Sequence, residues 1–253
     1  MNRTAPSRVA GDALVLESVT RTFGALKAIE NISFSVAAGE RRAVIGANGA
    51  GKTTLFNVIT GDFPASAGRV FFFGEDVTLH APFERIRMGL RRTYQSSLLF
   101  RDLSVRDNLF LAVRGVSRNR FSFIRNATSN PVRDLLERVR LSHLADAPVS
   151  SLSHGQQRQL EIGMALAGAP RLILFDEPAA GLSPAERAEL VALLGSLPSH
   201  MGYILIEHDL EIALRVVSRV TVMHNGRVLK HGTPAEIEND AEVQAIYMGG
   251  KHH

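Results

Sequence analysis

The stretch of sequence that decides the fold is Gly46-Ala47-Asn48-Gly49-Ala50-Gly51-Lys52-Thr53. It matches in full the pattern GxxxxGK followed by serine or threonine. An apolar run at residues 43–45 precedes it, and a helix-like stretch at residues 53–60 follows it as far as Gly61. In such a turn, glycines let backbone N–H groups point inward and hold phosphate oxygens, with help from the helix N-terminus. The alternative is a glycine-rich turn that matches by chance, and the strand–loop–helix context argues against it.

This loop predicts a binding site for the phosphates of a nucleoside triphosphate. The Lys52 ammonium supplies a point charge to the β- and γ-phosphates, and the Thr53 hydroxyl can be a ligand of Mg²⁺. The other loop residues that we expect to bind the nucleotide are Gly46, Asn48, Gly49, Ala50, Gly51 and Thr54.

A second element for the same phosphates is the stretch Leu172-Ile173-Leu174-Phe175-Asp176-Glu177. Asp176 ends a continuous apolar run, which is typical of a buried parallel strand, and it can hold Mg²⁺ through water. Glu177 is then placed to orient or deprotonate the attacking water. Two acidic residues after a strand are by themselves more often a solvated strand end. Together with the phosphate loop they indicate a P-loop NTPase, a class that still includes small-molecule kinases.

A third motif, Leu152-Ser153-His154-Gly155-Gln156, narrows the choice. With it the sequence resembles the ABC ATPase family, whose signature is LSGGQ followed by a basic helical stretch. The continuation in this chain is Gln157-Arg158-Gln159-Leu160-Glu161. The resemblance covers about residues 14–248, which is essentially the whole chain.

Four further marks of the family fall in order along the chain. Phe23 matches the aromatic residue that stacks on adenine, and Gln95 matches the glutamine that begins the helical insert and contacts Mg²⁺. Residues 180–183 match the loop at the dimer interface, and His208 matches the switch histidine. Taken singly, Phe23 would be a core aromatic residue, Gln95 a surface amide and His208 a histidine that is hydrogen-bonded to a carbonyl. Their coordinated spacing favours the functional interpretation.

The resemblance implies that one chain is not the working unit, because two ATPase subunits of this family pack head to tail. The Ser153 hydroxyl and the Gly155 backbone, together with Gln156, would close on the γ-phosphate held by the other chain's Lys52. ATP binding would then drive closure, and hydrolysis would release it. The partner would be a second copy or a paralogue. The catalytic residues that the resemblance implies are Glu177, His208 and Lys52.

Two positions depart from the family pattern. His154 replaces the first of the two signature glycines, and Ser183 stands where the interface loop usually carries aspartate. Because a non-glycine residue does not freely adopt positive φ, we expect ordinary helix-entry geometry at His154. Ser153 would also be the N-cap of that helix.

Several stretches resemble one subgroup, the ATPases of branched-chain amino-acid importers and their urea and amide relatives. They are RTYQ, SHGQQRQLEIG, DEPAAGLSPAE, LIEHDL and the ending GTPAEI…IYMGG. The subgroup implies transmembrane permease subunits as partners and, indirectly, an external solute-binding protein. In the stretch Leu98-Leu99-Phe100 we expect at least one residue, with Phe100 as the first candidate, to contact the permease; the alternative is that all three are core residues.

The expected fold is α/β. It combines a P-loop ATPase core, which has a mixed and largely parallel sheet and an antiparallel β N-terminal part, with an inserted α-helical subdomain at about residues 96–169. Ile32, Phe34 and Val36 alternate with polar residues, as in a half-exposed strand. Asn225-Gly226 predicts the tight turn of a hairpin, and Thr233 is expected to open the last helix. One domain would span 14–248, between a flexible N-terminus at 1–13 and a tail at 249–253.

The composition sets further limits. Of 253 residues 45% are apolar, which is enough for a sizeable core, and the formal charge is +4. There are no cysteines, which excludes a disulfide framework, thiol catalysis and cysteine metal sites. No block of Lys and Arg marks a nucleic-acid tail, so we expect no nucleic-acid partner.

No apolar run approaches the ~20 residues that span a bilayer, and the first residues carry no apolar core of a signal peptide. We therefore expect a protein at the cytoplasmic face of the cell membrane, held there peripherally through permease subunits. Two other functions are compatible with parts of the pattern. A soluble ABC ATPase in nucleic-acid or ribosome work would usually carry coiled coils or two tandem cassettes. A P-loop phosphotransferase would need an acceptor pocket and has no use for the signature.

Overall fold

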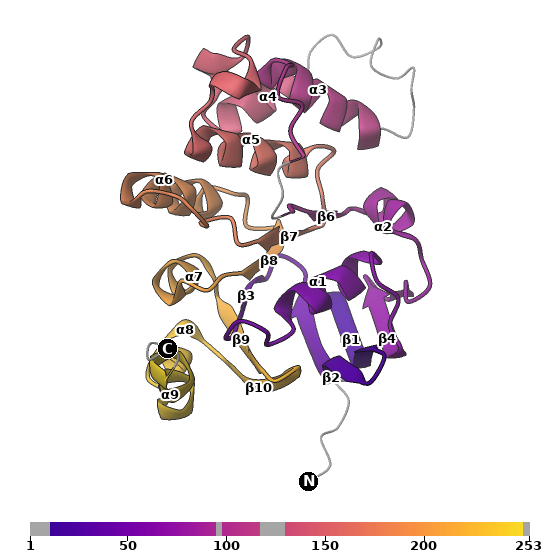
Figure 1. The fold of residues 1–253 in the computed structure, drawn as a ribbon. Helices are drawn as coiled ribbons and strands as arrows, with labels where there is room; N and C mark the ends of the chain where they lie inside the picture. The colour runs from indigo at the N-terminus through magenta and orange to yellow at the C-terminus, as the bar shows by residue number, and fades with distance from the viewer. Residues whose placement is uncertain (1–10, 95–97, 117–129, 250–253) are drawn as a thin grey trace.

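The computed structural model describes residues 11–94, 98–116 and 130–249, which form two sheets and the helices around them (Figure 1). The first sheet is antiparallel and has the strand order β2-β1-β4-β5. Its strands are β1 (Asp12–Phe23), β2 (Leu26–Ala37), β4 (Ala67–Phe72) and β5 (Glu75–Asp76). Ile32, Phe34 and Val36 of β2 are buried, and the residues between them are more exposed, so the predicted alternation is confirmed.

The second sheet has the strand order β10-β9-β3-β8-β7-β6 and is parallel except for its edge strand β10. Its strands are β3 (Arg41–Ile45), β6 (Leu90–Arg92), β7 (Leu172–Asp176), β8 (Gly202–Ile206), β9 (Arg219–His224) and β10 (Arg227–Gly232). The predicted hairpin joins β9 to β10, and Asn225 and Gly226 at its turn have φ of 47° and 74°, as a tight turn of this kind requires. The expected combination of a largely parallel sheet with an antiparallel N-terminal part is confirmed.

Both faces of the parallel sheet are covered, which explains its continuous apolar strands. In β7, Leu172 and Leu174 pack in the core between the two sheets, where helix α1 (Lys52–Thr60) also lies. Ile173 and Phe175 face the other way, into a core shared with the helices. The strand is therefore apolar at every position up to Asp176.

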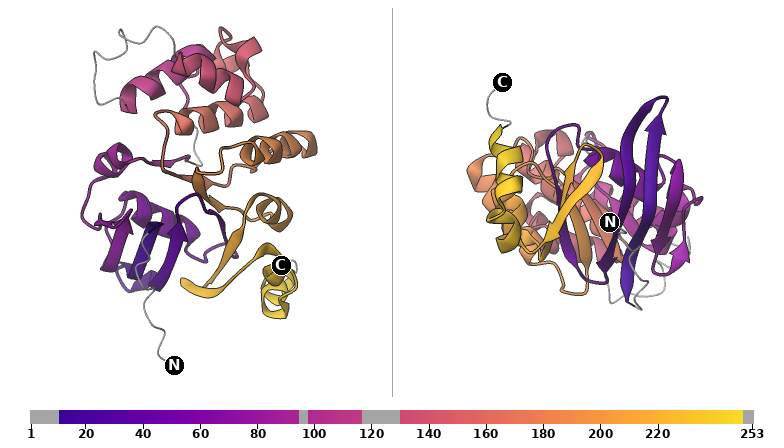
Figure 2. Two further views of the ribbon diagram at one scale, coloured as in Figure 1. Left: turned by 180° about the vertical axis from the view of Figure 1, so that it is seen from behind. Right: turned by 90° about the horizontal axis from the view of Figure 1, so that it is seen from below.

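Helices α3 (Val105–Val116), α4 (Pro131–Arg138) and α5 (His154–Leu166) gather at one end of the molecule (Figures 1 and 2). The side chain of Asn130 caps α4 by accepting a hydrogen bond from Arg133 N at 3.2 Å. The apolar residues of α4, Val132, Leu135 and Leu136, are buried in the shared core. The remaining helices are α2 (Pro82–Met88), α6 (Pro184–Gly195), α7 (Leu210–Val216), α8 (Pro234–Glu238) and α9 (Ala241–Gly249).

Two helices differ from the sequence expectation. Helix α2 was not predicted, because its periodicity is inverted: Arg85 is buried while Phe83 and Ile86 are exposed. Helix α8 begins after Thr233 as expected, but α9 follows it, so the prediction that α8 is the last helix was wrong. Within the described parts of the chain, none of the helices has the length and apolarity needed to cross a bilayer.

Candidate functional site

The elements singled out in the sequence meet at one edge of the parallel sheet. Strands β3, β8 and β7 are direct neighbours, and each ends at a residue that precedes a polar or glycine-rich segment. Parallel strands end at the same edge, so Gly46, Glu177 and His208 are brought to one side of the molecule although they lie far apart in the chain. This edge is the usual place for a ligand in an open α/β sheet.

The phosphate loop has a backbone that only glycine can adopt at two positions. Gly51, the N-cap of α1, has φ of 95°, and a Cβ there would lie 2.5 Å from the Ala28 carbonyl oxygen. At Gly46 a Cβ would lie 2.3 Å from the Met223 carbonyl oxygen. Backbone from β2 and β9 therefore closes on the loop from both sides and fixes its shape.

The turn between β9 and β10 braces the loop. Gly226 N donates a hydrogen bond to Ala50 O at 3.2 Å, and Glu30 N donates to Gly226 O at 2.8 Å. The sequence indicated this turn as a hairpin only. No local signal connects it with the loop, because the contact is between segments about 175 residues apart.

A cavity of about 580 Å³ lies over the loop. The predicted site residues that line it are Asn48, Gly49, Ala50, Gly51, Lys52, Thr53, Thr54 and Glu177. Sequence analysis did not predict its other lining residues, which are Leu26, Lys27, Ala28, Asn225 and Gly226. The structure therefore brings the loop and Glu177 together around one space.

Lys52 is buried and bonded to its own loop. Its Nζ donates hydrogen bonds to Gly46 O at 2.7 Å and to Ala47 O at 3.1 Å. Burial lowers the pKa of Lys52, and the nearby carboxylates of Glu177 and Asp176 oppose that effect. The ammonium is thus held among carbonyl dipoles, and an incoming phosphate would add the strong anionic acceptor that it lacks.

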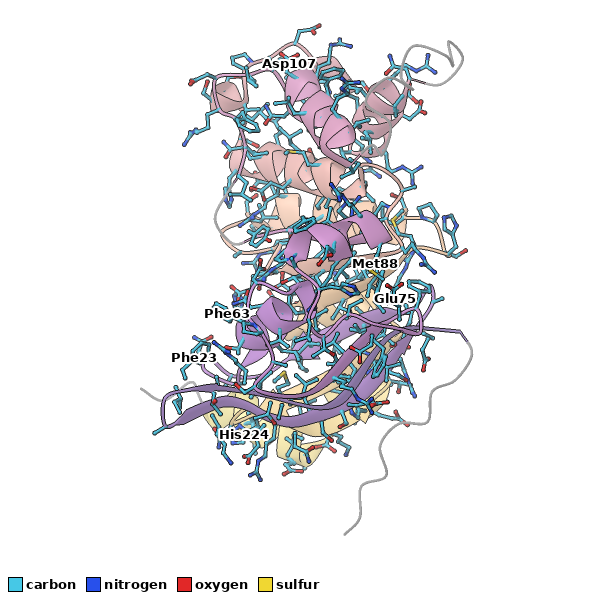
Figure 3. All side chains as sticks on the ribbon, turned by 90° about the vertical axis from the view of Figure 1, so that its right-hand side faces the viewer. Phe23, Phe63, Glu75, Met88, Asp107 and His224 are labelled. Atoms are coloured by element: carbon cyan, nitrogen blue, oxygen red, sulfur yellow. The ribbon has the colours of Figure 1, made fainter. Side chains whose placement is uncertain are left out.

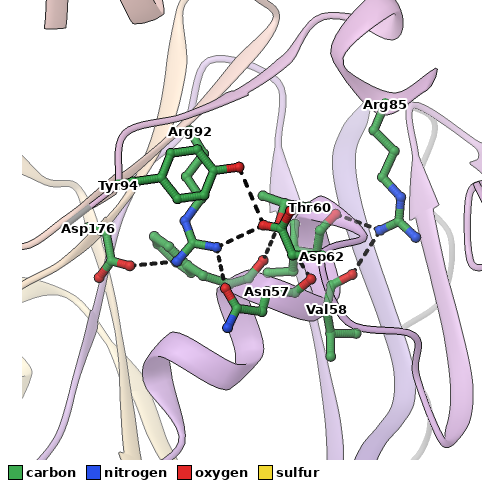
Figure 4. Close-up of polar contacts among 10 residues, drawn as sticks. Asn57, Val58, Thr60, Asp62, Arg85, Arg92, Tyr94 and Asp176 are labelled. Atoms are coloured by element: carbon green, nitrogen blue, oxygen red, sulfur yellow. Dashed lines mark hydrogen bonds and ion pairs between the residues drawn. The ribbon is translucent and has the colours of Figure 1, made fainter. Parts of the chain in front are cut away.

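Asp176 is held by an arginine that sequence analysis missed (Figure 4). Arg92 Nη2, on the neighbouring strand β6, donates to Asp176 Oδ2 at 2.7 Å, and both side chains are almost fully buried. The same guanidinium donates to Asn57 Oδ1 in the second half of α1 and to Asp62 Oδ2 just after the end of that helix. Its Cζ also lies 4.9 Å from the centre of the Tyr94 ring. Arg92 therefore ties Asp176 to the phosphate-loop helix.

Glu177 and His208 face each other across the edge of the sheet. His208 Nδ1 lies 3.8 Å from Glu177 Oε2, and Glu177 has a positive φ of 48°, which is uncommon outside glycine and typical of strained functional positions. A second carboxylate, Glu207, is fully buried, and its Oε2 lies 3.9 Å from His208 Nδ1. Burial raises the pKa of Glu207, and Ala179 N donates a hydrogen bond to its Oε1 at 2.9 Å.

Phe23 ends β1 and is 40% exposed. Its ring packs edge-on against Phe63, with 5.4 Å between centroids, and Arg21 lies over it (Figure 3). Phe23 pairs across the hairpin with Leu26, which lines the cavity and is 67% exposed. Phe23 itself does not line the cavity, so its role in stacking on a base stays a prediction. Gln95 lies outside the described residues.

The signature residues form a helix N-terminus away from the cavity lining. Ser153 is the N-cap of α5: its Oγ accepts from Gln156 N at 3.2 Å, and Gln156 Oε1 accepts from Ser153 N at 2.9 Å. His154 is the first residue of the helix and is not among the residues with positive φ, as expected. Within one chain, the structure does not bring Ser153, Gly155 or Gln156 to the phosphate loop.

A comparison with protein-family models identifies the chain. The model described as "ABC transporter" matches residues 29–180. This chain belongs to the ABC transporter family. As the ATP-binding subunit of such a transporter it hydrolyses ATP to power transport, so the predicted family, fold and ATPase activity are confirmed.

Similarity to individual proteins extends over nearly the whole chain. LptB, the lipopolysaccharide export system ATP-binding protein of Escherichia coli (strain K12), is 33% identical over 237 residues, covering 93% of this chain and 97% of LptB. LivG, the high-affinity branched-chain amino acid transport ATP-binding protein of Salmonella typhimurium (strain LT2), is 35% identical over 248 residues, again covering 93% and 97%. The crystal structure of the ADP conformation of an ATP-binding cassette of an ABC transporter has a TM-score of 0.81 and 33% identity, covering 94% of this chain and 99% of that one.

The residues present fit the Mg²⁺ that accompanies ATP in this kind of ATPase. Asp176 Oδ1 is buried and has no hydrogen-bond partner among the described residues, and the Thr53 side chain lines the cavity. Within the described ranges no cluster of three His, Asp or Glu residues could hold a metal alone. The cation would therefore share few protein ligands with phosphate oxygens and water, as Mg²⁺ usually does at such sites.

Proposed function

We propose that this ABC ATPase works as a head-to-tail pair and powers the import of branched-chain amino acids or a related small polar solute. The pair is formed with a second copy or a paralogue. It docks on permease subunits at the cytoplasmic face of the cell membrane, and an external solute-binding protein delivers the solute. A single domain at residues 14–248, with a helical insert at about 96–169, carries out this work.

Each chain supplies the phosphate half of a site. Lys52 would exchange its loop carbonyls for the β- and γ-phosphates, while the loop N–H groups hold the remaining oxygens. Glu177 would orient the attacking water and accept its proton, and His208, 3.8 Å from Glu177, would hold that carboxylate and the γ-phosphate in register. Mg²⁺, bound near Thr53, Gln95 and Asp176, would neutralise charge that develops on the phosphates.

The observation that carries the proposal is the separation of Ser153 from the phosphate cavity. Lys52, Thr53 and Glu177 line one cavity, and the lining of that cavity includes no signature residue. The signature residues therefore have no phosphate to bind within their own chain. A second chain, rotated so that its phosphate loop meets this signature, would supply it.

The experiment that tests the pairing mixes two inactive variants. Lys52→Ala removes the phosphate lysine and keeps the signature, whereas Ser153→Arg blocks the signature and keeps the phosphate loop. In a head-to-tail dimer with one of each, both lesions fall in the same site and the other site is intact. We expect the mixture to regain part of the ATPase activity.

The control for this experiment is a dimer of wild type with Ser153→Arg, which also has one intact site. If that control hydrolyses ATP while the mixture stays inactive, the two motifs act within one chain and the head-to-tail proposal fails. This design assumes that the chain pairs with itself. Co-purification of the two variants through a different affinity tag on each checks that the mixed dimer forms.

The import proposal is supported by the subgroup motifs and by the likeness to LivG, whose name concerns branched-chain amino acids. LptB, at 33% identity, is named for export, so the direction needs its own test. The direct test is to isolate the chain from native membranes and identify the permease subunits that accompany it. Vesicles reconstituted with those subunits, together with the solute-binding protein, should then take up branched-chain amino acids when ATP is supplied. Uptake of none of them would contradict the proposed solute class.

The permease contact is proposed at the start of the helical insert. Phe100 is 53% exposed and Leu98 is 64% exposed, whereas Leu99 packs on the helical core. The alternative that all three are core residues is therefore wrong. Two hydrogen bonds between Asn108 and the Phe100 backbone, at 2.9 and 3.0 Å, hold the backbone that carries this aromatic side chain.

A permease helix would use the Phe100 ring as an anchor, and such aromatic anchors are worth ~2 kcal/mol or more. Phe100→Ala should keep ATP binding by the isolated chain, weaken assembly with the permease and abolish transport. If ATP binding by the isolated chain is lost as well, Phe100 has a structural role and the contact lies elsewhere.

A further inference from the structure

The N-terminus of the signature helix is occupied by a side chain of the same chain. Gly155 N donates a hydrogen bond to Glu186 Oε1 at 2.9 Å, and Ser153 Oγ lies 3.4 Å from the same oxygen. Glu186 belongs to α6, which follows the interface loop. One carboxylate oxygen thus accepts from both groups that the proposed function assigns to the partner's γ-phosphate.

The second oxygen of this carboxylate holds its own helix. Ser183 N donates to Glu186 Oε2 at 2.9 Å, and Ser183 Oγ donates to it at 2.8 Å. These hydrogen bonds, first that from the Ser183 N–H, lower the pKa of Glu186, so it carries a negative charge at neutral pH. A single anion therefore joins the N-termini of α5 and α6.

Both departures from the family pattern lie beside this contact. Ser183 is the N-cap of α6 and binds Glu186. The His154 ring lies against Gly181 in the interface loop, where a Cβ would lie 3.0 Å from His154 Cε1. At Gly155 a Cβ would lie 2.5 Å from Glu186 Oε1. His154, which replaces the first signature glycine, thus packs on the interface loop. The second signature glycine, Gly155, is retained and leaves room for the Glu186 carboxylate.

We propose that Glu186 is an internal occupant of the signature anion site, which the γ-phosphate held by the partner must displace before the dimer closes. Two anions cannot share the Ser153 hydroxyl and the Gly155 N–H without strong repulsion. Glu186 therefore sets the ATP concentration at which closure occurs. This inference rests on the proposed head-to-tail function.

The test measures ATP-driven dimerisation in a Glu177→Gln background, in which ATP persists. Glu186→Gln keeps the size and an accepting oxygen but removes the charge. We expect the ATP concentration for half-maximal dimerisation, measured by sedimentation, to fall about 5- to 10-fold, the scale of a charge-assisted hydrogen bond at an accessible site. The matched control is Glu189→Gln, one turn further along α6, whose carboxylate contacts Gln159 Nε2 at 3.4 Å and no signature donor.

A second measurement does not depend on dimerisation. Gly155 is the second residue of α5, and N–H groups in the first turn have no acceptor within the helix. Its protection from hydrogen exchange in the nucleotide-free chain therefore depends on Glu186, and Glu186→Ala should make this amide exchange at least about 10-fold faster. Glu189→Ala should leave its exchange unchanged.

The outcomes separate the two ideas. If Glu177→Gln does not dimerise with ATP, the chain does not pair head to tail with itself, and the competition falls with that pairing. If Glu177→Gln dimerises, but Glu186→Gln leaves the ATP concentration for half-maximal dimerisation unchanged or raises it, the competition between Glu186 and the γ-phosphate is wrong and the head-to-tail function stands. If the Gly155 amide hydrogen exchanges fast in wild type and Glu186→Ala does not change its rate, the hydrogen bond between Gly155 and Glu186 is absent.

Discussion

The two halves of the proposed ATP site differ in how far one chain completes them. The phosphate loop is packed between β2 and the β9–β10 turn and opens into a cavity of about 580 Å³. Its lysine is buried and already bonded to carbonyl oxygens. The signature, by contrast, lies at an exposed helix N-terminus, and a side chain from α6 binds its donors.

This difference indicates which half is fixed and which half responds. The phosphate loop is held by backbone, so it can bind a nucleotide without rearranging. The Gly155 N–H and the Ser153 hydroxyl of the signature are bound by one glutamate side chain, which a competing anion can displace. We therefore expect lesions in the first half to damage folding or chemistry in the isolated chain, and lesions in the second half to act mainly through the partner.

The largest effect is expected for Glu177→Gln. The variant should still bind ATP, because the phosphate contacts remain, but turnover should slow by about 10²–10⁴-fold, the usual contribution of a positioned base. The closed dimer should accumulate. Measurement of phosphate release beside ATP binding decides this, and an undiminished rate would remove Glu177 from the mechanism.

Arg92→Ala should strongly destabilise the isolated chain. It breaks a buried ion pair and leaves Asp176 charged without its partner, which costs about 3–5 kcal/mol in comparable cases. Urea unfolding measures the loss. Saturating ATP with Mg²⁺ should restore part of it, because the cation offers Asp176 a new partner. Arg87→Ala, which removes an exposed guanidinium, should be within about 0.5 kcal/mol of wild type.

Two glycine substitutions test the contrast between backbone and side-chain packing directly. Gly51→Ala places a methyl group against the Ala28 carbonyl at a position with φ of 95°, so it should cost about 1–3 kcal/mol of unfolding free energy. In Gly155→Ala the three atoms nearest to the new methyl group all belong to the Glu186 side chain, which can move away, so the substitution should cost far less. Equal losses would contradict the distinction between a fixed and a responsive half.

Phe23→Ala tests whether the phosphate-loop half of the site extends as far as the base of the nucleotide. If its ring stacks on the base, nucleotide affinity should fall by about 1–3 kcal/mol for any purine triphosphate. Isothermal titration measures this, with Leu26→Ala beside it because Leu26 lines the cavity. If Leu26→Ala weakens binding while Phe23→Ala does not, the base lies on Leu26 and the ring serves only to pack on Phe63.

The smallest effect concerns Glu207, whose carboxylate lies close to His208. Burial raises its pKa above the usual 4.5, so its neutral form is the one that the fold favours. Its contribution to stability is full below pH 4.5 and is lost as the pH rises through its value in the fold. Glu207→Gln should therefore gain stability relative to wild type as the pH rises from 4.5. If the difference in unfolding free energy between Glu207→Gln and wild type does not change with pH, ionisation of Glu207 does not destabilise the fold.

Most of the fold and half of the site could be predicted from the sequence, because those features depend on neighbours in the chain. The phosphate loop, the strand before Asp176 and the cap at Ser153 all repeat local rules of spacing and residue type. Helix α2 escaped prediction because Arg85 replaces an apolar residue on its buried face. There Arg85 donates to the Val58 and Ile59 carbonyl oxygens at the end of α1 (Figure 4).

The sequence by itself determined the chemistry: which residues can hold phosphates, which can activate water and which helix offers donors to a second phosphate. Only the tertiary structure decided which other residues of the chain bind these functional groups. Arg92 meets Asp176 across 84 residues, and Glu186 meets Gly155 across 31. Such contacts follow from how sheets and helices pack, and no short pattern records them. The physical reason is that a charged side chain takes the nearest complementary partner in space, and the fold sets which partner that is.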